Sequence, residues 1–129
     1  DYTYRSGLVA AEKLLSRKAA PSAIFASNDD MAAAAVSVAH RRGLDVPRDL
    51  SVVGFDDSSS ATTVWPELTT VRQPIAAMAD AAVDVLLRSI RNGELGERTI
   101  VDEIFGHQLV LRQSVAPPPG MPTGPRRRK

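Results

Sequence analysis

The sequence contains no cysteine, which excludes disulfide bonds and thiolate metal sites and fits a reducing cytoplasm. Aromatic residues make up 5% of the chain, too few for a surface on which nucleic-acid bases stack. No apolar run reaches the roughly 18–20 residues of a membrane-spanning helix. Neither sign of charge is in excess, because 16 basic residues balance 15 acidic ones to a net charge of +1. Bulk charge therefore directs the body of the chain neither to nucleic acid nor to an acidic partner.

The length of 129 residues suits one small domain or part of a larger one. The chain opens with "DYTYRSG", without a methionine or a basic-then-apolar leader, so we expect an internal piece of a longer protein. A signal peptide further upstream is left open by this observation. The stretch "APPPGMPTGPRRRK" is rich in proline and glycine and ends in basic residues, which predicts a disordered tail over 116–129.

Apolar residues in the first half alternate between helical and strand-like spacing. This predicts four elements: a helix from near Tyr4 to before Pro21, a strand at 23–27, a helix after Asp29 that ends before Gly43, and a strand at 50–55. Asp29 is the expected N-cap of the second helix, and Gly43 is its expected left-handed stop. Helices and strands that alternate across short connections are typical of a parallel sheet with crossover helices, so the predicted fold class is α/β.

The second half predicts a loop, further strands and one long helix: a loop at 56–67 with a short helix in 58–64, a strand at 68–72, a helix opened by Gln73-Pro74 and ended by Gly93, and strands at 99–105 and 108–112. Pro74 is expected at the first position of the long helix, where its missing N–H costs nothing. Trp65, the single tryptophan, lies in the loop, and it suits either the edge of the core or a surface for a partner.

Polar side chains follow three of the predicted strands. Asn28 follows the first strand, Asp56 the second and Gln73 the third. Because ligands of open parallel sheets bind beyond the carboxyl ends of the strands, we expect these side chains to meet at one rim. Two amides and a carboxylate offer donors and acceptors that suit a hydroxyl-rich molecule. Helix capping and turn formation explain the same residues, so both roles are open at this point.

Other chemistry has weaker support in the sequence. Four carboxylates could hold Mg²⁺ or act as a glycosidase-like pair: Asp29, Asp30, Asp56 and Asp57. No glycine-rich phosphate loop accompanies them, and the serines at 58–60 lack a nucleophile-elbow pattern. His40 and His107 make a poor metal pair. We therefore expect no catalytic residue, no metal and no cofactor.

Four linked segments carry a family resemblance: "NDDMA", "GLDVPRDLSVVGFDD", "PELTTVRQP" and "LVLRQS". In this order and spacing, across residues 1–118, they resemble the effector-binding core of the LacI/GalR family of bacterial transcription repressors. The resemblance implies part of a periplasmic-binding-protein-like type I fold, in which two α/β subdomains close on a small effector, a sugar or less often a purine. It further implies a cytoplasmic homodimer that reads operator DNA through an upstream helix-turn-helix domain absent from this chain, with no membrane contact.

The resemblance also implies roles for single residues. Asn28 matches an amide that hydrogen-bonds the effector, Asp56 matches an acidic ligand residue, and Gln73 matches the polar residue at the crossover between subdomains. Ile75 would lie near an apolar wall, and Asp57 would be structural. Two positions depart from the family pattern: Ala34 replaces a common glycine, and Thr63 replaces a frequent aromatic residue in a loop at the dimer contact.

The same resemblance implies a division of the chain. Residues 1–115 would be the C-terminal portion of the effector-binding domain, in which 1–72 and about 106–113 form the C-terminal subdomain and about 73–105 belong to the N-terminal one. The predicted function is the effector-binding and dimerisation part of a repressor. The alternative is the substrate-binding protein of a sugar ABC transporter, which shares the fold but carries an export leader. An enzyme would need a nucleophile or metal set that the sequence lacks.

Overall fold

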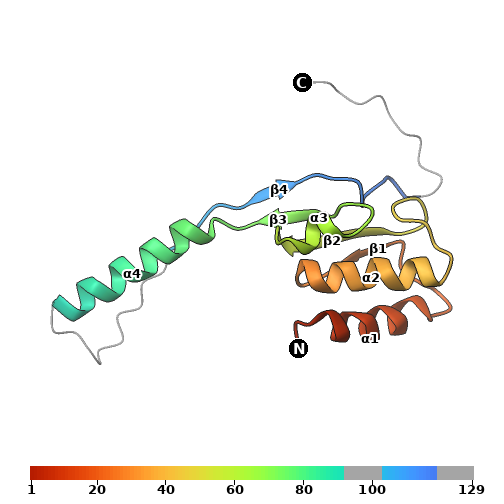
Figure 1. Ribbon diagram of the computed structural model, residues 1–129, viewed down its shortest axis with the longest axis horizontal. Coiled ribbons are helices and arrows are strands. Elements are labelled where there is room, and N and C mark those ends of the chain that lie inside the picture. Colours follow the sequence, from red (N-terminus) through yellow and green to blue (C-terminus); the bar gives the residue numbers. More distant parts are fainter. Residues whose placement is uncertain (92–102, 119–129) are drawn as a thin grey trace, which may run out of the picture. The chain divides into compact units, whose positions relative to one another are not determined.

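The computed structural model describes residues 1–91 and 103–118 of the chain (Figure 1). Its elements are, in order, α1 (Tyr4–Leu15), β1 (Ala23–Phe25), α2 (Asp29–Arg41), β2 (Ser51–Asp56), α3 (Ser60–Thr63), β3 (Thr69–Arg72), α4 (Ile75–Arg91) and β4 (Gln108–Val110). The strands form one sheet in the order β1-β2-β3-β4, and both β1–β2 and β2–β3 pair in parallel. The predicted α/β parallel sheet with crossover helices is therefore confirmed.

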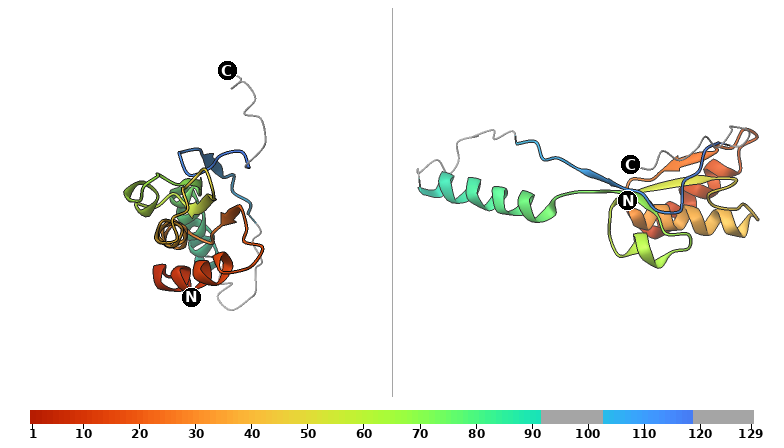
Figure 2. Two further views of the ribbon diagram at one scale, coloured as in Figure 1. Left: turned by 90° about the vertical axis from the view of Figure 1, so that its right-hand side faces the viewer. Right: turned by 90° about the horizontal axis from the view of Figure 1, so that it is seen from above.

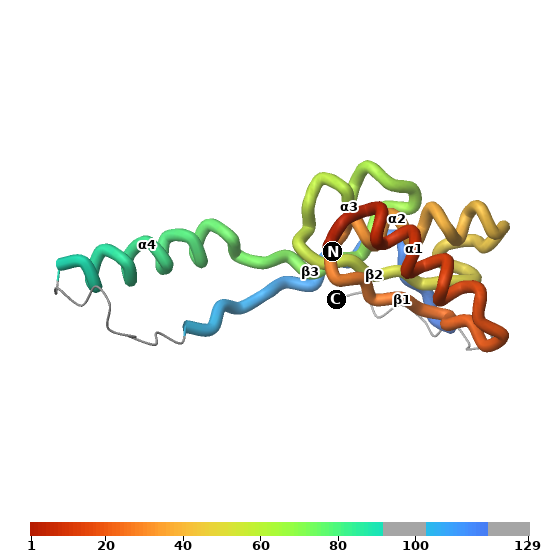
Figure 3. Tube along the Cα trace, turned by 90° about the horizontal axis from the view of Figure 1, so that it is seen from below, coloured from red at the N-terminus to blue at the C-terminus, as the bar shows by residue number. Residues whose placement is uncertain are grey.

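The chain packs as two units. One holds residues 1–72 together with the segment that begins at Leu109, and the other holds residues 73–108. In the first unit α2 packs on β2 and β1, and α1 packs along α2, as the ribbon and the tube both show (Figures 1 and 3). In the second unit none of the residues of α4 is buried. No helix in the described part of the chain is both long and apolar enough to span a bilayer.

The core of the first unit lies between α2 and the sheet. Its largest fully buried apolar side chains are Leu50, Leu68, Val36, Val38 and Val52. Alanines on α2 allow close approach of α1, and the crossing point is Gly7, where an added Cβ would lie 2.8 Å from the Met31 Cα and 2.9 Å from the Ala34 Cβ. Small residues at this contact explain why two helices can share one face of a narrow sheet.

The opposite face of the sheet carries aromatic residues. Side chains alternate along β2, so Phe55 points away from the face on which α2 packs. Its ring meets that of Phe25 edge to face, with 6.5 Å between ring centroids. Phe25 is 67% exposed, so this face is an apolar surface within the first unit. Figure 2 shows the backbone of the unit from two further directions.

Most predicted elements of the first unit form, but the predicted cap of α2 is wrong. Asn28, not Asp29, is the N-cap, because its side-chain oxygen accepts a hydrogen bond from the Met31 N–H and its backbone is extended. Asp29 is the first helical residue and turns its carboxylate into the protein, where it is 1% exposed. Gly43 ends the helix with a φ of 73°, as predicted.

In the second unit α4 begins at Ile75, one residue after the expected start at Pro74. The strand predicted at 99–105 is not seen at 103–105, and its remaining residues, like Gly93, lie outside the described residues. The predicted tail from 116 also lies mostly outside them. Its first residue, Ala116, exchanges two hydrogen bonds with the Ser51 hydroxyl, each 3.1 Å long.

Candidate functional site

Two of the three predicted site residues lie at one edge of the sheet in the first unit. Asn28 follows β1, and Asp56 is the last residue of β2. Because β1 and β2 are adjacent and parallel, both residues stand at the carboxyl ends of their strands. Gln73 directly follows β3 but belongs to the second unit, where it is half-buried. The rim that the first unit contributes is thus an amide next to a carboxylate, at the edge where α/β sheets bind ligands.

Asn28 already has two structural partners. Its Oδ1 caps α2 at 2.9 Å from the Met31 nitrogen, and its Nδ2 donates to the Tyr2 carbonyl at 3.0 Å. A primary amide has two N–H donors and two acceptor lone pairs, so one of each is left after these bonds. Capping and ligand binding, which the sequence posed as alternatives, are therefore compatible at this residue.

Tyr2 joins the rim through that hydrogen bond. The contact is made by the backbone carbonyl of Tyr2, and the residue as a whole is 74% exposed. It precedes α1 and takes part in no apolar pattern, so the sequence analysis did not single it out. Only the fold brings the Tyr2 carbonyl to the Asn28 amide, 26 positions away in the chain.

Asp56 and Asp57 form an unusual turn at the end of β2. Their φ angles are 103° and 56°, a region that side chains other than glycine rarely adopt. Aspartate is one of the residues other than glycine that adopt it more often, because its short side chain can hydrogen-bond locally, and such conformations gather at functional sites. The turn sends the two side chains to different places: Asp56 is exposed, whereas the Asp57 side chain is 7% exposed.

The buried Asp57 carboxylate forms ion pairs with two arginines. Its oxygens lie 2.6 Å from Arg72 on β3 and 2.6 Å from Arg112 beyond β4. The hydrogen bond from Arg112, helped by that from Arg72, holds the pKa of Asp57 below its ordinary value although burial opposes the shift. The carboxylate stays ionised and satisfied, which agrees with the structural role expected for this residue.

The acidic cluster does not converge on one point. Asp29 accepts hydrogen bonds from the Thr70 hydroxyl at 2.6 Å and the Ser58 N–H at 2.7 Å, and Asp30 accepts one from the Ser60 hydroxyl. Each carboxylate therefore has its own protein partners. Within residues 1–91 and 103–118, no three histidine, aspartate or glutamate side chains are placed to hold a metal ion.

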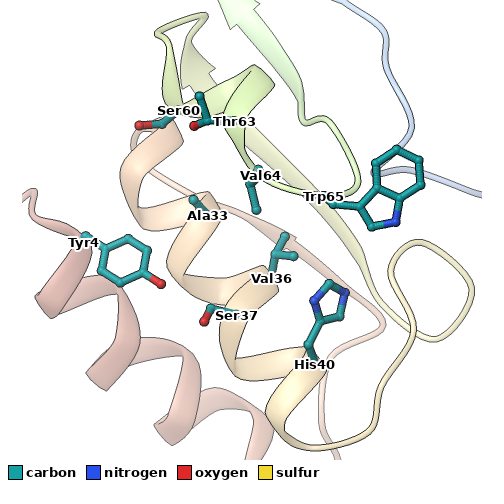
Figure 4. Close-up of a pocket in the computed structure, with 9 residues that line it drawn as sticks. All are labelled: Tyr4, Ala33, Val36, Ser37, His40, Ser60, Thr63, Val64 and Trp65. Atoms are coloured by element: carbon teal, nitrogen blue, oxygen red, sulfur yellow. The ribbon is translucent and has the colours of Figure 1, made fainter.

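A groove of about 530 Å³ lies on another side of the first unit, between α1, α2 and the segment around α3 (Figure 4). It is lined by Tyr4, Ala33, Val36, Ser37, His40, Ser60, Thr63, Val64 and Trp65. Tyr4 and Trp65 flank it from opposite sides in Figure 4 and are 44% and 73% exposed. Trp65 is thus not packed into the edge of the core, which leaves the surface role.

A family model described as the periplasmic binding protein-like domain matches residues 1–115. The chain belongs to this family. Among curated proteins it is 41% identical over 114 residues to catabolite control protein A of Priestia megaterium, a match that covers 88% of this chain and 33% of the relative. The chain thus spans about a third of the length of the curated relatives it matches.

Solved structures agree with this assignment. A complex of the transcriptional regulator CelR with cellobiose is 35% identical, with a TM-score of 0.76 over 88% of this chain and 34% of that one. The Lac repressor dimer bound to operator and an anti-inducer is 30% identical, with a TM-score of 0.77 over 89% of this chain and 39% of that one. The resemblance to LacI-type regulators and the periplasmic-binding-protein-like fold are therefore confirmed.

Proposed function

We propose that this chain is the effector-binding and dimerisation part of a LacI-type transcriptional repressor. The observation that carries the proposal is the Asp56 turn, in which a strained backbone presents an exposed carboxylate beside the Asn28 amide at the ligand-binding edge of a parallel sheet. The proposed effector is a small polar molecule. A sugar or related polyol is the first candidate, and a purine is the second. Binding rather than catalysis is the role of the site, as in the regulators to which the chain is similar.

Each rim residue has a distinct part in this proposal. Asp56 accepts hydrogen bonds from vicinal hydroxyl groups, and Asn28 supplies its remaining N–H and lone pair. Gln73, which directly follows β3, is proposed to supply a further amide donor and acceptor to the effector. An effector controls the complete repressor if it binds one of two conformations of that protein more tightly than the other.

The second unit is proposed to be a piece of a separate subdomain. Its helix α4 exposes a row of apolar side chains: Ile75, Val83, Leu86, Leu87 and Ile90 are 43% to 58% exposed. An apolar helix face is normally buried against another element, yet no residue of α4 is buried. We assign the missing cover to the N-terminal subdomain of the complete repressor, whose helix-turn-helix domain would read operator DNA in the cytoplasm.

The test is a binding screen on the complete gene product. Glucose, galactose, ribose, maltose, cellobiose and hypoxanthine are ranked by thermal shift, and the affinity of each hit is measured by calorimetry. Asp56→Ala should weaken binding of the hit by roughly 1–3 kcal/mol, because hydroxyl groups lose a charged acceptor. Asp45→Ala, which removes an exposed carboxylate from a distant turn, serves as the matched control.

Three outcomes would contradict the proposal. Unchanged affinity of the Asp56→Ala protein would remove the site assignment. Turnover of a sugar that Asp56→Asn abolishes while binding is retained would indicate an enzyme. A gene that encodes an export leader and no helix-turn-helix would favour the transporter receptor.

A further inference from the structure

The two segments of chain that connect the units both lie next to Asp57. The chain leaves the first unit after Arg72 and returns to it at Leu109. Arg72 is the last residue of β3, and Arg112 comes shortly after the return. Both guanidinium groups reach the Asp57 carboxylate, one on each oxygen, at 2.6 Å. The Asp57 side chain therefore binds both the segment that leaves the first unit and the segment that returns to it.

The returning segment is held by more than the ion pair. Arg112 also donates from its guanidinium to the Leu68 carbonyl at 2.8 Å and from its backbone N–H to the Thr69 hydroxyl at 3.0 Å. Its side chain is 14% exposed, against 51% for Arg72. The Arg112 arm is thus the buried and rigid one, and the Arg72 arm is the exposed one. Loss of the Asp57 carboxylate would leave the nearly buried Arg112 guanidinium with only the more exposed and more distant Glu67, whose Oε2 lies 3.8 Å from its Nε, as counter-charge.

The carboxylate is also tied to the rim. Asp57 follows Asp56 directly, and both residues have positive φ angles. The Asp57 N–H donates to the Thr70 hydroxyl, which in turn donates to Asp29. The two aspartates are joined by a single peptide bond, and the Asp57 side of that bond is held by the hydrogen bond to Thr70 and by the two arginines. The turn formed by Asp56 and Asp57, here called the rim turn, and the two connecting segments thus meet at the Asp57 residue.

We propose that Asp57 is a positioning residue that holds both connecting segments to the rim turn. Its regulatory meaning rests on the proposed function: a molecule that displaces Asp56 would act through Asp57 on the two segments between the units. The anchoring itself is a property of the ligand-free protein. It differs from general stabilisation because its loss should loosen two short segments rather than the whole first unit.

The test is hydrogen exchange of the complete gene product without ligand, read on peptides by mass spectrometry. Asp57→Asn should raise the exchange rate by about tenfold or more at both 70–73 and 109–113, while α2 keeps its protection. Arg72→Gln should loosen only 70–73, because the Arg112 arm stays in place. Arg112→Lys, which keeps the charge but loses the fork, should loosen 109–113 more strongly than 70–73.

Asp49→Asn is the matched control, because it removes a carboxylate that pairs with Arg48 on an exposed turn. It should leave both segments protected. An even rise in exchange across the whole first unit in Asp57→Asn would overturn the positioning role. An unchanged rate at 70–73 in Arg72→Gln would overturn it too. Arg72 is half-exposed, so the Arg72→Gln protein should fold. If no sugar binds in the screen described above, the proposed function is contradicted. The hydrogen-exchange result for the Asp57 variants does not depend on that outcome.

Discussion

The Asp29 carboxylate fills the space next to Gly54 that the Cβ of any other residue would occupy. From this position it accepts hydrogen bonds from Thr70 on β3 and from the backbone of Ser58 beyond β2. The first residue of α2 is thereby fastened to two strands and to the loop that carries the rim turn. Gly54 is needed for the absence of its side chain and not for a left-handed backbone, because its φ is not in that region.

Gly54→Ala should therefore destabilise the protein by about 3 kcal/mol, because the added methyl group displaces a buried carboxylate from two hydrogen bonds. Urea unfolding followed by circular dichroism measures the change. Gly106→Ala is the control, since nothing lies within 4 Å of the added Cβ. Equal stability of the two variants would show that Asp29 can move at no cost.

Asn28 allows its capping and binding roles to be separated. Asn28→Asp keeps the oxygen that caps α2 and should change stability little, because aspartate is as good an N-cap as asparagine. The same change removes the N–H donors and should weaken the sugar hit of the screen about tenfold or more. Calorimetry measures affinity, and thermal unfolding measures the cap.

Asn28→Ala provides the comparison, because it removes both groups and should cost about 1 kcal/mol of stability as well as affinity. If Asn28→Asp bound the sugar as the wild type does, the amide would be a cap only. Effector binding would then depend on Asp56 rather than on the Asn28 amide.

The groove between Tyr4 and Trp65 is proposed as the contact with a second copy of the chain. Trp65→Ser should shift the complete protein toward monomer in sedimentation velocity, because a large exposed aromatic side chain at an interface supplies much of its binding energy. Val9→Ser removes an apolar side chain that is 68% exposed on α1 but does not line the groove, so it should leave the dimer intact. A Trp65→Ser protein that remains dimeric would place the interface elsewhere.

The Asp57 ion pairs predict a specific acid sensitivity. Because the pKa of Asp57 is lowered in the folded state, its contribution to stability is complete above the unfolded pKa of about 3.9 and is lost as the pH falls through the folded value. Wild type should be more stable than Asp57→Asn by about 1 kcal/mol at pH 7, a global loss too small to remove the protection of α2, and the gap should shrink below about pH 4. Urea unfolding at pH 7, 4 and 3 measures it. A gap that is constant with pH would mean that the charge of Asp57 does not matter.

Much of the first unit could be predicted from local pattern. Apolar periodicity located α1, α2, β2 and β3, and Gly43 ended α2 as expected, because these features depend on neighbours within a few residues. The N-cap was assigned to the wrong residue of the pair Asn28-Asp29. Both residue types cap helices equally well, and the choice was made by a buried site for Asp29 that lies on other strands.

The candidate site divides in the same way. The sequence placed Asn28, Asp56 and Gln73 after their strands, and topology alone brings Asn28 and Asp56 to one edge. The hydrogen bond from Asn28 to the Tyr2 carbonyl and the ion pairs of Asp57 with Arg72 and Arg112 could not be predicted, since these partners are separated by 15 to 55 positions. From the sequence alone, the adjacent pair Asp56 and Asp57 does not indicate which of the two carboxylates turns inward.

By itself, then, the sequence determined the order of the elements, the α/β class and the family, because periodicity and linked motifs are local and survive without coordinates. The tertiary structure alone decided that Asp29 and Asp57 turn into the first unit, whereas Asp56 is exposed. That decision depends on burial: a charge inside the unit must find partners on other strands, and only the folded chain brings Thr70, Arg72 and Arg112 within hydrogen-bonding distance.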